Sequence, residues 1–157
     1  MQVILIRHAE AIDETLALRD PHRPLSERGR VQARALGDRL RWHDCVPTRV
    51  FTSPLVRAVQ TAELVIGRFE TEHHVDVVPA LAPGENPREF LAALREEPAH
   101  TIAFVVGHEP GLSAIGALLT HDPEFAALGK AQAARIVDAV LRWRFACDAE
   151  APVAATR

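Results

Sequence analysis

Short apolar segments alternate with longer amphipathic segments along this chain, and this alternation limits the folds it can adopt. The first apolar segment, residues 3–6, is continuous, as is typical of a strand buried on both faces of a parallel sheet. Three later segments are also short and apolar, and segments whose apolar residues have helical spacing follow them. The strands are expected at 2–6, 49–52, 75–78 and 101–106. This order predicts an α/β fold of three layers, αβα, with a mostly parallel central sheet between helices.

The expected helices begin at residues that favour helix N-termini. Ser26 suits the N-cap of the first helix, and Ser53-Pro54 combines an N-cap residue with a proline at the first helical position of the second, which should end near Ile66. Asn86-Pro87 repeats this pattern for the third. The apolar residues at helical spacing are expected to face the sheet. They are Val31, Ala35, Leu36 and Leu40 in the first helix, Phe90, Leu91 and Leu94 in the third, and Leu112, Ile115, Leu118 and Leu119 in the fourth.

The last quarter of the chain fits two structures. Residues 133–145 space their apolar side chains either as a helix does or in the alternation of strands, and we favour strands. Residues 148–157 are small and polar without a period, which predicts a flexible tail. The chain has 157 residues, of which 48% are hydrophobic, so it can bury a core without disulfides or a structural metal. We therefore expect one domain over residues 1–147.

Composition argues against several classes of partner. Asp and Glu (21) slightly outnumber Lys and Arg (18), which makes a nucleic-acid or membrane partner unexpected. Cys45 and Cys147 lie far apart, and His73-His74 lacks the further ligands of a metal site, so we expect neither a metal nor another cofactor. No segment has the length of a signal-peptide core or a membrane span, and the expected location is cytoplasmic.

Cationic residues follow three of the expected strands. Arg7-His8 ends the first strand, and Gly107-His108 ends the fourth. Arg57 lies one turn into the helix after the second strand, and its side chain should lean back toward the helix start. In open α/β sheets ligands bind beyond the carboxyl ends of the strands, where helix N-termini also favour anions. Two arginines and two histidines at one edge predict a phosphate site.

His8 is the candidate nucleophile of this site. Neighbouring guanidinium groups lower the pKa of a histidine and keep its imidazole neutral. If a backbone carbonyl accepts a hydrogen bond from Nδ1–H of His8, then Nε2 presents a lone pair to phosphorus. Arginines would neutralise the phosphoryl oxygens during in-line transfer. The expected reaction passes through a phosphohistidine.

Three motifs follow one another along the chain. They are Leu5-Ile6-Arg7-His8-Ala9-Glu10-Ala11, Ser53-Pro54-Leu55-Val56-Arg57-Ala58-Val59-Gln60-Thr61-Ala62 and Gly107-His108-Glu109-Pro110-Gly111. Their order and spacing resemble those of the histidine phosphatase, or phosphoglycerate-mutase-like, superfamily. The short chain, the R-P-L-S-x-x-G stretch at 23–29 and the third motif resemble its small bacterial SixA-type branch. The resemblance spans most of residues 1–120.

The resemblance also implies roles for single residues. It makes His8 the phosphorylated nucleophile and places Arg7, Arg57 and His108 around the phosphate, with Arg23 at the rim. Ala9 replaces a glycine that is common in the family, so the loop must avoid a positive φ there. Larger relatives supply a general acid after the third strand. Glu85 lies in that region, and Glu10 and Glu109 are alternatives.

These observations predict a metal-independent phosphatase. The preferred substrate, which rests on the resemblance and on the small size of the chain, is a phosphohistidine on a partner protein such as a histidine phosphotransfer domain. One alternative is a phosphatase for a small phosphorylated metabolite. The other is an interaction module that binds phosphate and turns it over weakly or not at all.

Overall fold

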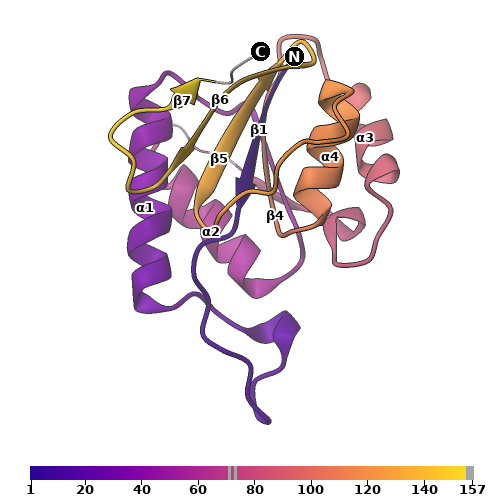
Figure 1. Ribbon diagram of the computed structural model, residues 1–157. Coiled ribbons are helices and arrows are strands. Elements are labelled where there is room, and N and C mark those ends of the chain that lie inside the picture. The colour runs from indigo at the N-terminus through magenta and orange to yellow at the C-terminus, as the bar shows by residue number, and fades with distance from the viewer. Residues whose placement is uncertain (71, 73, 155–157) are drawn as a thin grey trace.

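The computed structural model describes residues 1–70, 72 and 74–154, and it arranges them as a central sheet between two layers of helices (Figure 1). The elements in chain order are β1 (Gln2–Arg7), η1 (Asp20–His22), α1 (Glu27–Trp42), β2 (Arg49–Thr52), α2 (Val56–Ile66), β3 (Val75–Val77), η2 (Pro79–Leu81), α3 (Pro87–Arg95), β4 (Ile102–Gly107), α4 (Gly111–Thr120), β5 (Gln132–Val137), β6 (Val140–Ala146) and β7 (Val153–Ala154). The predicted α/β class and the layers of helices on both faces are confirmed.

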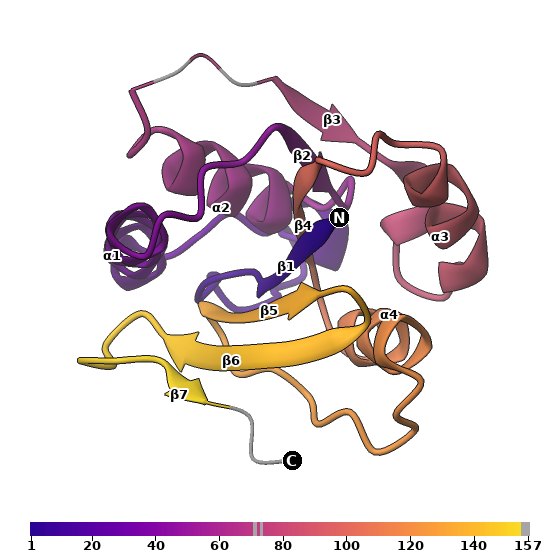
Figure 2. The same ribbon diagram turned by 90° about the horizontal axis from the view of Figure 1, so that it is seen from above.

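The strand order is β3-β2-β4-β1-β5-β6-β7. The four strands expected from the sequence are parallel to one another, and β1 pairs with β4 from Gln2↔Ile102 to Arg7↔Gly107. The last three strands extend the sheet in antiparallel fashion from β1. Figure 2 shows α1 and α2 on one side of the sheet and α3 and α4 on the other.

Strand β1 lies in the interior of the sheet and contributes to a core on each face. Ile4 and Ile6 pack in the cluster under α1 and α2, whereas Val3 and Leu5 pack in the cluster under α3 and α4. All four side chains are buried because successive residues of a strand point to opposite faces. This explains why the segment is apolar throughout rather than at alternate positions.

Helix α1 begins as predicted but buries a partly different face. Ser26 is the N-cap, and its Oγ accepts a hydrogen bond from Gly29 N at 3.0 Å. Leu36 and Leu40 are buried, whereas Val31 is 61% exposed and Ala33 is buried in its place. The expectation for Val31 was wrong. Val31 and Leu36 are five positions apart, so at about 100° per residue their side chains point about 140° apart around the helix.

Helix α2 begins later than the sequence indicated. Ser53-Pro54 precedes the helix instead of opening it, and Leu55 is the N-cap. Ser53 Oγ instead accepts a hydrogen bond from Leu55 N at 3.4 Å, so it shapes the turn between β2 and α2. The predicted end at Ile66 is confirmed.

Helix α3 begins as predicted, with Asn86 as its N-cap and Pro87 at its first position. Asn86 Oδ1 accepts a hydrogen bond from Arg88 N at 3.0 Å. Phe90, Leu91 and Leu94 are buried against the sheet as expected.

The preference for strands in the last quarter is confirmed by the antiparallel pair β5 and β6. Within the segment expected to be a tail, Val153–Ala154 forms β7 and pairs with Trp143 and Arg144 of β6. No helix in the described part of the chain is long and apolar enough to cross a bilayer.

Candidate active site

The carboxyl ends of β1 and β4 lie side by side and place His8 next to the Gly107-His108 turn. His8 N donates a hydrogen bond to Gly107 O at 2.9 Å and continues the pairing by one residue. After β1 the chain continues to α1 on one face of the sheet, and after β4 it continues to α4 on the other. In open α/β sheets such a divergence of neighbouring connections is a usual place for a ligand.

Hydrogen bonds at both ring nitrogens fix the imidazole of His8. Nδ1 lies 2.8 Å from Ala9 O, and because a carbonyl only accepts, Nδ1 carries the proton. Nε2 then has the lone pair, and it accepts a hydrogen bond from Arg57 Nε at 3.2 Å. This is the tautomer that leaves Nε2 as the nucleophilic atom.

The surroundings of His8 favour its neutral form. Only 7% of the residue is exposed. The pKa of His8 is lowered from its ordinary value of 6.5 to about 4. Burial is the largest cause, the hydrogen bond to the Ala9 carbonyl opposes it, and the charges of Arg57, Arg7 and His108 add to the lowering. The charge of His108 acts on His8 because the two histidines follow neighbouring parallel strands. His8 is therefore uncharged at neutral pH.

Ala9 fits the loop at the position where the family resemblance leads us to expect glycine. It is fully buried, and its N–H donates a hydrogen bond to Thr61 Oγ1 at 3.1 Å. Thr61 Oγ1 in turn donates to Arg57 O at 2.7 Å. Ala9 is not among the residues with positive φ, so its side chain adds no backbone strain.

Arg57 reaches His8 from the first turn of α2. The residue is 5% exposed, and its guanidinium contacts three different acceptors. Besides His8 Nε2, it donates from Nη1 to Asp20 O at 2.8 Å and from Nη2 to Asp20 Oδ2 at 3.2 Å. An arginine has five N–H groups, so two of them remain for a ligand.

Asp20 joins Arg57 to Arg23. Arg23 donates to Asp20 Oδ1 from Nε at 3.0 Å and from Nη2 at 2.8 Å. Although partial burial acts to raise it, hydrogen bonds from Arg23 and Arg57 lower the pKa of Asp20 below its ordinary value. Arg23, which the resemblance placed at the rim, is thus linked to the candidate site through this carboxylate.

Asp20 is the residue at this site that the sequence did not single out. It lies in η1, a short 3₁₀ helix in the long connection between β1 and α1. That connection has no hydrophobic period to indicate which of its residues turn inward. The spacing of Asp20 and Arg23, which suits an i,i+3 ion pair, was the one signal available.

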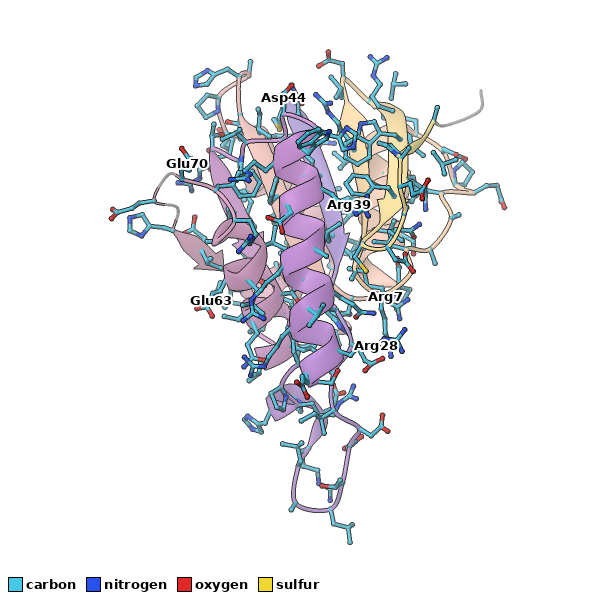
Figure 3. The ribbon with its side chains drawn as sticks, turned by 90° about the vertical axis from the view of Figure 1, so that its left-hand side faces the viewer. Arg7, Arg28, Arg39, Asp44, Glu63 and Glu70 are labelled. Carbon is cyan, nitrogen blue, oxygen red and sulfur yellow. The ribbon has the colours of Figure 1, made fainter. Side chains whose placement is uncertain are left out.

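Arg7 ends β1 next to His8, and Figure 3 labels its side chain toward the lower end of the sheet. Its Nη1 donates a hydrogen bond to Leu128 O at 2.7 Å. Its Nε is buried and, among the described residues, has no hydrogen-bond partner. Since an unsatisfied buried donor is costly, this N–H favours an anionic acceptor at the site.

The ring of His108 is held through Nε2. Nε2 lies 3.0 Å from Leu81 O, so it carries a proton, and Nδ1 is the ring atom left for a ligand. His108 also lines a hollow of about 240 Å³ together with Glu85. The exposed side chain of Glu85 thus borders the His108 side of the site.

Two other carboxylates are engaged in structural contacts. Glu10 Oε1 accepts a hydrogen bond from Ser26 Oγ at 2.8 Å, at the start of α1. Glu109 accepts hydrogen bonds from two backbone N–H groups, those of Ser113 and Leu128. Neither carboxylate contacts His8 or Arg57 within the described residues.

No cluster of potential metal ligands occurs among the described residues. His73 of the His73-His74 pair lies outside them. A cavity of about 670 Å³ lies against β6 and β7, and none of the residues proposed for phosphate binding lines it. The cationic residues at the ends of β1 and β4 are therefore the site that suits phosphate chemistry, with a neutral imidazole between arginines.

The chain is similar in sequence to proteins of a known family. The family model of the histidine phosphatase superfamily (branch 1) matches residues 3–82. The phosphohistidine phosphatase SixA of Escherichia coli is 31% identical over 113 residues, which cover 70% of this chain and 68% of SixA.

Solved structures agree on the fold. The protein histidine phosphatase SixA complexed with tungstate superimposes with a TM-score of 0.85 at 23% identity, covering 94% of this chain and 97% of that one. A putative alpha-ribazole-5'-P phosphatase from E. coli superimposes with a TM-score of 0.70 at 22% identity, covering 87% and 90%. The chain therefore belongs to the histidine phosphatase superfamily, branch 1, as a phosphatase of the SixA type.

Proposed function

We propose that this phosphatase works through a phosphohistidine formed at His8. Nε2 of His8 attacks phosphorus, an Nε2–P bond forms, and the bond from phosphorus to the leaving group breaks as that group takes up a proton. Water then attacks phosphorus, the Nε2–P bond breaks, and inorganic phosphate and neutral His8 are released. The observation that carries the proposal is the hydrogen bond from Arg57 Nε to His8 Nε2, because it places the lone pair beside a phosphate-binding cation.

Arg57 has to exchange partners during the first step. Its Nε–H engages the lone pair that His8 needs for attack. A phosphoryl oxygen can replace Nε2 as the acceptor, which frees the nucleophile and places positive charge where the transition state needs it. Arg7, through its unpartnered Nε, and His108, through Nδ1, are the further phosphate ligands in this proposal.

The proposed substrate is a phosphohistidine on a partner protein, such as a histidine phosphotransfer domain. The hollow beside His108, of about 240 Å³, does not include His8, Arg7 or Arg57 in its lining, so it does not enclose a whole small molecule around the nucleophile. A side chain presented by a protein surface needs less enclosure than a free metabolite does. The similarity to SixA, a phosphohistidine phosphatase, supports the same choice.

A small phosphorylated metabolite is the second candidate substrate. The likeness to a putative alpha-ribazole-5'-P phosphatase favours it, because that protein has the same fold. Glu85 is the proposed proton donor to an alkoxide leaving group, since it borders the hollow next to His108. A P–N bond is more labile than a P–O ester bond, so a phosphohistidine substrate would depend less on Glu85.

A substrate panel tests the proposal. Phosphohistidine protein, p-nitrophenyl phosphate and sugar phosphates are assayed with the wild-type chain, with His8→Ala and with His100→Ala, which removes an exposed histidine. We expect turnover and acid-labile labelling of the protein that only His8→Ala abolishes. Phosphate binding without labelling would identify a binding module, and inhibition by EDTA would contradict the metal-free mechanism.

Comparing the substrates then decides between the candidates. A value of kcat/KM at least tenfold higher for phosphohistidine protein than for any small phosphate supports the protein substrate. The reverse order would establish the metabolite alternative.

A further inference from the structure

The carboxylate of Glu109, directly after His108, joins two segments that are distant in sequence. Oε1 accepts a hydrogen bond from Leu128 N at 2.7 Å, and Oε2 accepts one from Ser113 N at 3.0 Å. Ser113 belongs to the first turn of α4, where free N–H groups favour a negative charge. Leu128 belongs to the loop between α4 and β5 and is 1% exposed. Glu109 thus fixes this loop against the start of α4.

The same loop holds Arg7 and His8 of the first motif. Leu128 O accepts the hydrogen bond from Arg7 Nη1 at 2.7 Å. Ala131 N donates a hydrogen bond to His8 O at 3.2 Å. Leu128 is therefore bound on both sides, by Glu109 at its N–H and by Arg7 at its carbonyl.

The orientation of the Arg7 guanidinium depends on the carbonyl of Leu128. Among the described residues, Leu128 O is the hydrogen-bond acceptor of the Arg7 guanidinium, and the buried Nε has none. A guanidinium held at one nitrogen keeps its other N–H groups aimed in a fixed direction only as long as that acceptor stays in place. A shift of Leu128 would move the Arg7 N–H groups that the proposed function assigns to the phosphate.

We infer that Glu109 is a positioning residue for phosphate binding, acting through Leu128 on Arg7. It does not touch the substrate, and both of its oxygens are engaged by N–H donors, so it does not serve as the proton donor. Charge-assisted hydrogen bonds of this kind are about twice as strong as neutral ones, which suits a contact that has to hold a loop. The inference rests on the proposed function, because it assigns Glu109 a part in the same site.

Glu109→Gln is the informative change. It keeps the size of the side chain and one acceptor oxygen, but it presents an NH₂ group to the second N–H donor. Asp122→Asn is the matched control, because Asp122 Oδ1 accepts a hydrogen bond from Glu124 N at 2.9 Å in the same loop without contact to Leu128. Both changes remove one carboxylate charge, so a general effect of charge would appear in both.

A double-mutant cycle with Arg7→Ala provides the test. The kcat/KM for p-nitrophenyl phosphate and the Kd for tungstate are measured for the wild-type chain, Glu109→Gln, Arg7→Ala, the double variant and Asp122→Asn. We expect Glu109→Gln to lower kcat/KM and weaken tungstate binding by about tenfold, less than the ~10²–10³ for removing a donor that touches the reacting group. In the Arg7→Ala background the same change should have less than a twofold effect, and Asp122→Asn should leave both quantities unchanged.

Equal effects of Glu109→Gln in both backgrounds would overturn the inference, because a residue that acts through Arg7 has no effect without it. A lower unfolding midpoint in urea together with an unchanged tungstate Kd would overturn it too, since that pattern indicates a purely structural role. Tungstate affinity needs no turnover. A wild-type chain that binds tungstate but hydrolyses no substrate would contradict the proposed function and still allow the cycle to be read.

Discussion

The carboxylate of Asp20 contacts the arginines that a bound phosphate would also contact. It gives one oxygen to Arg57 and the other to Arg23, so it satisfies the cations that a phosphate would also contact. Because 41% of the side chain is exposed, these ion pairs contribute modestly to stability. A dianionic phosphate can therefore compete with Asp20 for the two arginines.

We predict that Asp20→Asn strengthens the binding of inorganic phosphate by about fivefold, on the order of 1 kcal/mol. The change removes the competing charge, while the backbone carbonyl at position 20 still accepts the hydrogen bond from Arg57 Nη1 and keeps that side chain in place. The inhibition constant of phosphate against p-nitrophenyl phosphate measures the effect. Asp13→Asn, an exposed change in the same connection, serves as the control. Unchanged or weaker inhibition in Asp20→Asn would refute the competition.

The residues that sequence reasoning identified here, and the one it missed, differ in their local setting. Arg7 ends β1, and His8 and His108 directly follow β1 and β4, so the strand pattern fixes where these residues lie in the fold. Asp20 lies in a connection whose path depends on contacts with α2 and not on its own sequence pattern. The place of Asp20 at the site is therefore evident only from the folded structure.

At the scale of elements, α1 is fixed to the segment that follows His8. Ser26 N donates to Glu10 O at 3.0 Å, and Ser26 Oγ donates to Glu10 Oε1 at 2.8 Å. A Cβ at Gly29 would lie 1.9 Å from Glu10 O, so only glycine permits this approach. The glycine of the R-P-L-S-x-x-G stretch is thus explained by backbone packing close to His8.

We predict that Gly29→Ala destabilises the protein by about 1–3 kcal/mol despite the better helix propensity of alanine, because backbone cannot yield as a flexible side chain does. Unfolding in urea measures this change, and kcat/KM should fall with it since Glu10 lies two residues after His8. Arg30→Ala, an exposed change on the same helix, should leave both values close to those of the wild-type chain. A Gly29→Ala variant as stable as Arg30→Ala would contradict the packing argument.

The starts of two helices were predictable from their cap residues, whereas Ser53-Pro54, which also suits a helix start, lies before α2. Ser26 and Asn86 cap α1 and α3 as expected, because the side-chain oxygen of each meets an N–H of the first turn. The buried face of α1 was less predictable, since Val31 is apolar but lies off the stripe formed by Ala33, Leu36 and Leu40. Hydrophobicity alone does not place an apolar residue on the covered face.

For the molecule as a whole, the parallel arrangement of β1 to β4 followed from the sequence, whereas the place of the antiparallel strands in the sheet did not. The strands β1 to β4 alternate with helices, and this arrangement limits their connections. The pair β5 and β6 adds to the other side of β1, and nothing in its alternation specifies that neighbour. Its loop to α4 nevertheless supplies the backbone that holds Arg7 and His8, so the half of the fold that was hardest to predict completes the site.

The charge state of this site also affects the stability of the whole molecule. His8 has a pKa of about 4 in the folded chain, against an ordinary value of 6.5. Between these values the unfolded chain binds a proton that the folded chain does not, so the free energy of unfolding rises with pH across this window. Lowering the pH from 6.5 to 4 should therefore remove roughly 3 kcal/mol of stability through His8 alone. Asp20, whose pKa is lowered, adds a loss that begins only near and below its ordinary value of 3.8.

We predict that His8→Gln flattens this dependence. Urea unfolding at several pH values between 7 and 4 should show the wild-type chain losing about 2–3 kcal/mol more than His8→Gln, because glutamine does not titrate. His100→Gln removes an exposed histidine and should retain the wild-type slope. Direct titration of the His8 ring by NMR should give a pKa near 4 in the same protein. Parallel stability curves for wild-type chain and His8→Gln, or a ring that titrates near 6.5, would show that burial and the surrounding cations do not keep His8 neutral.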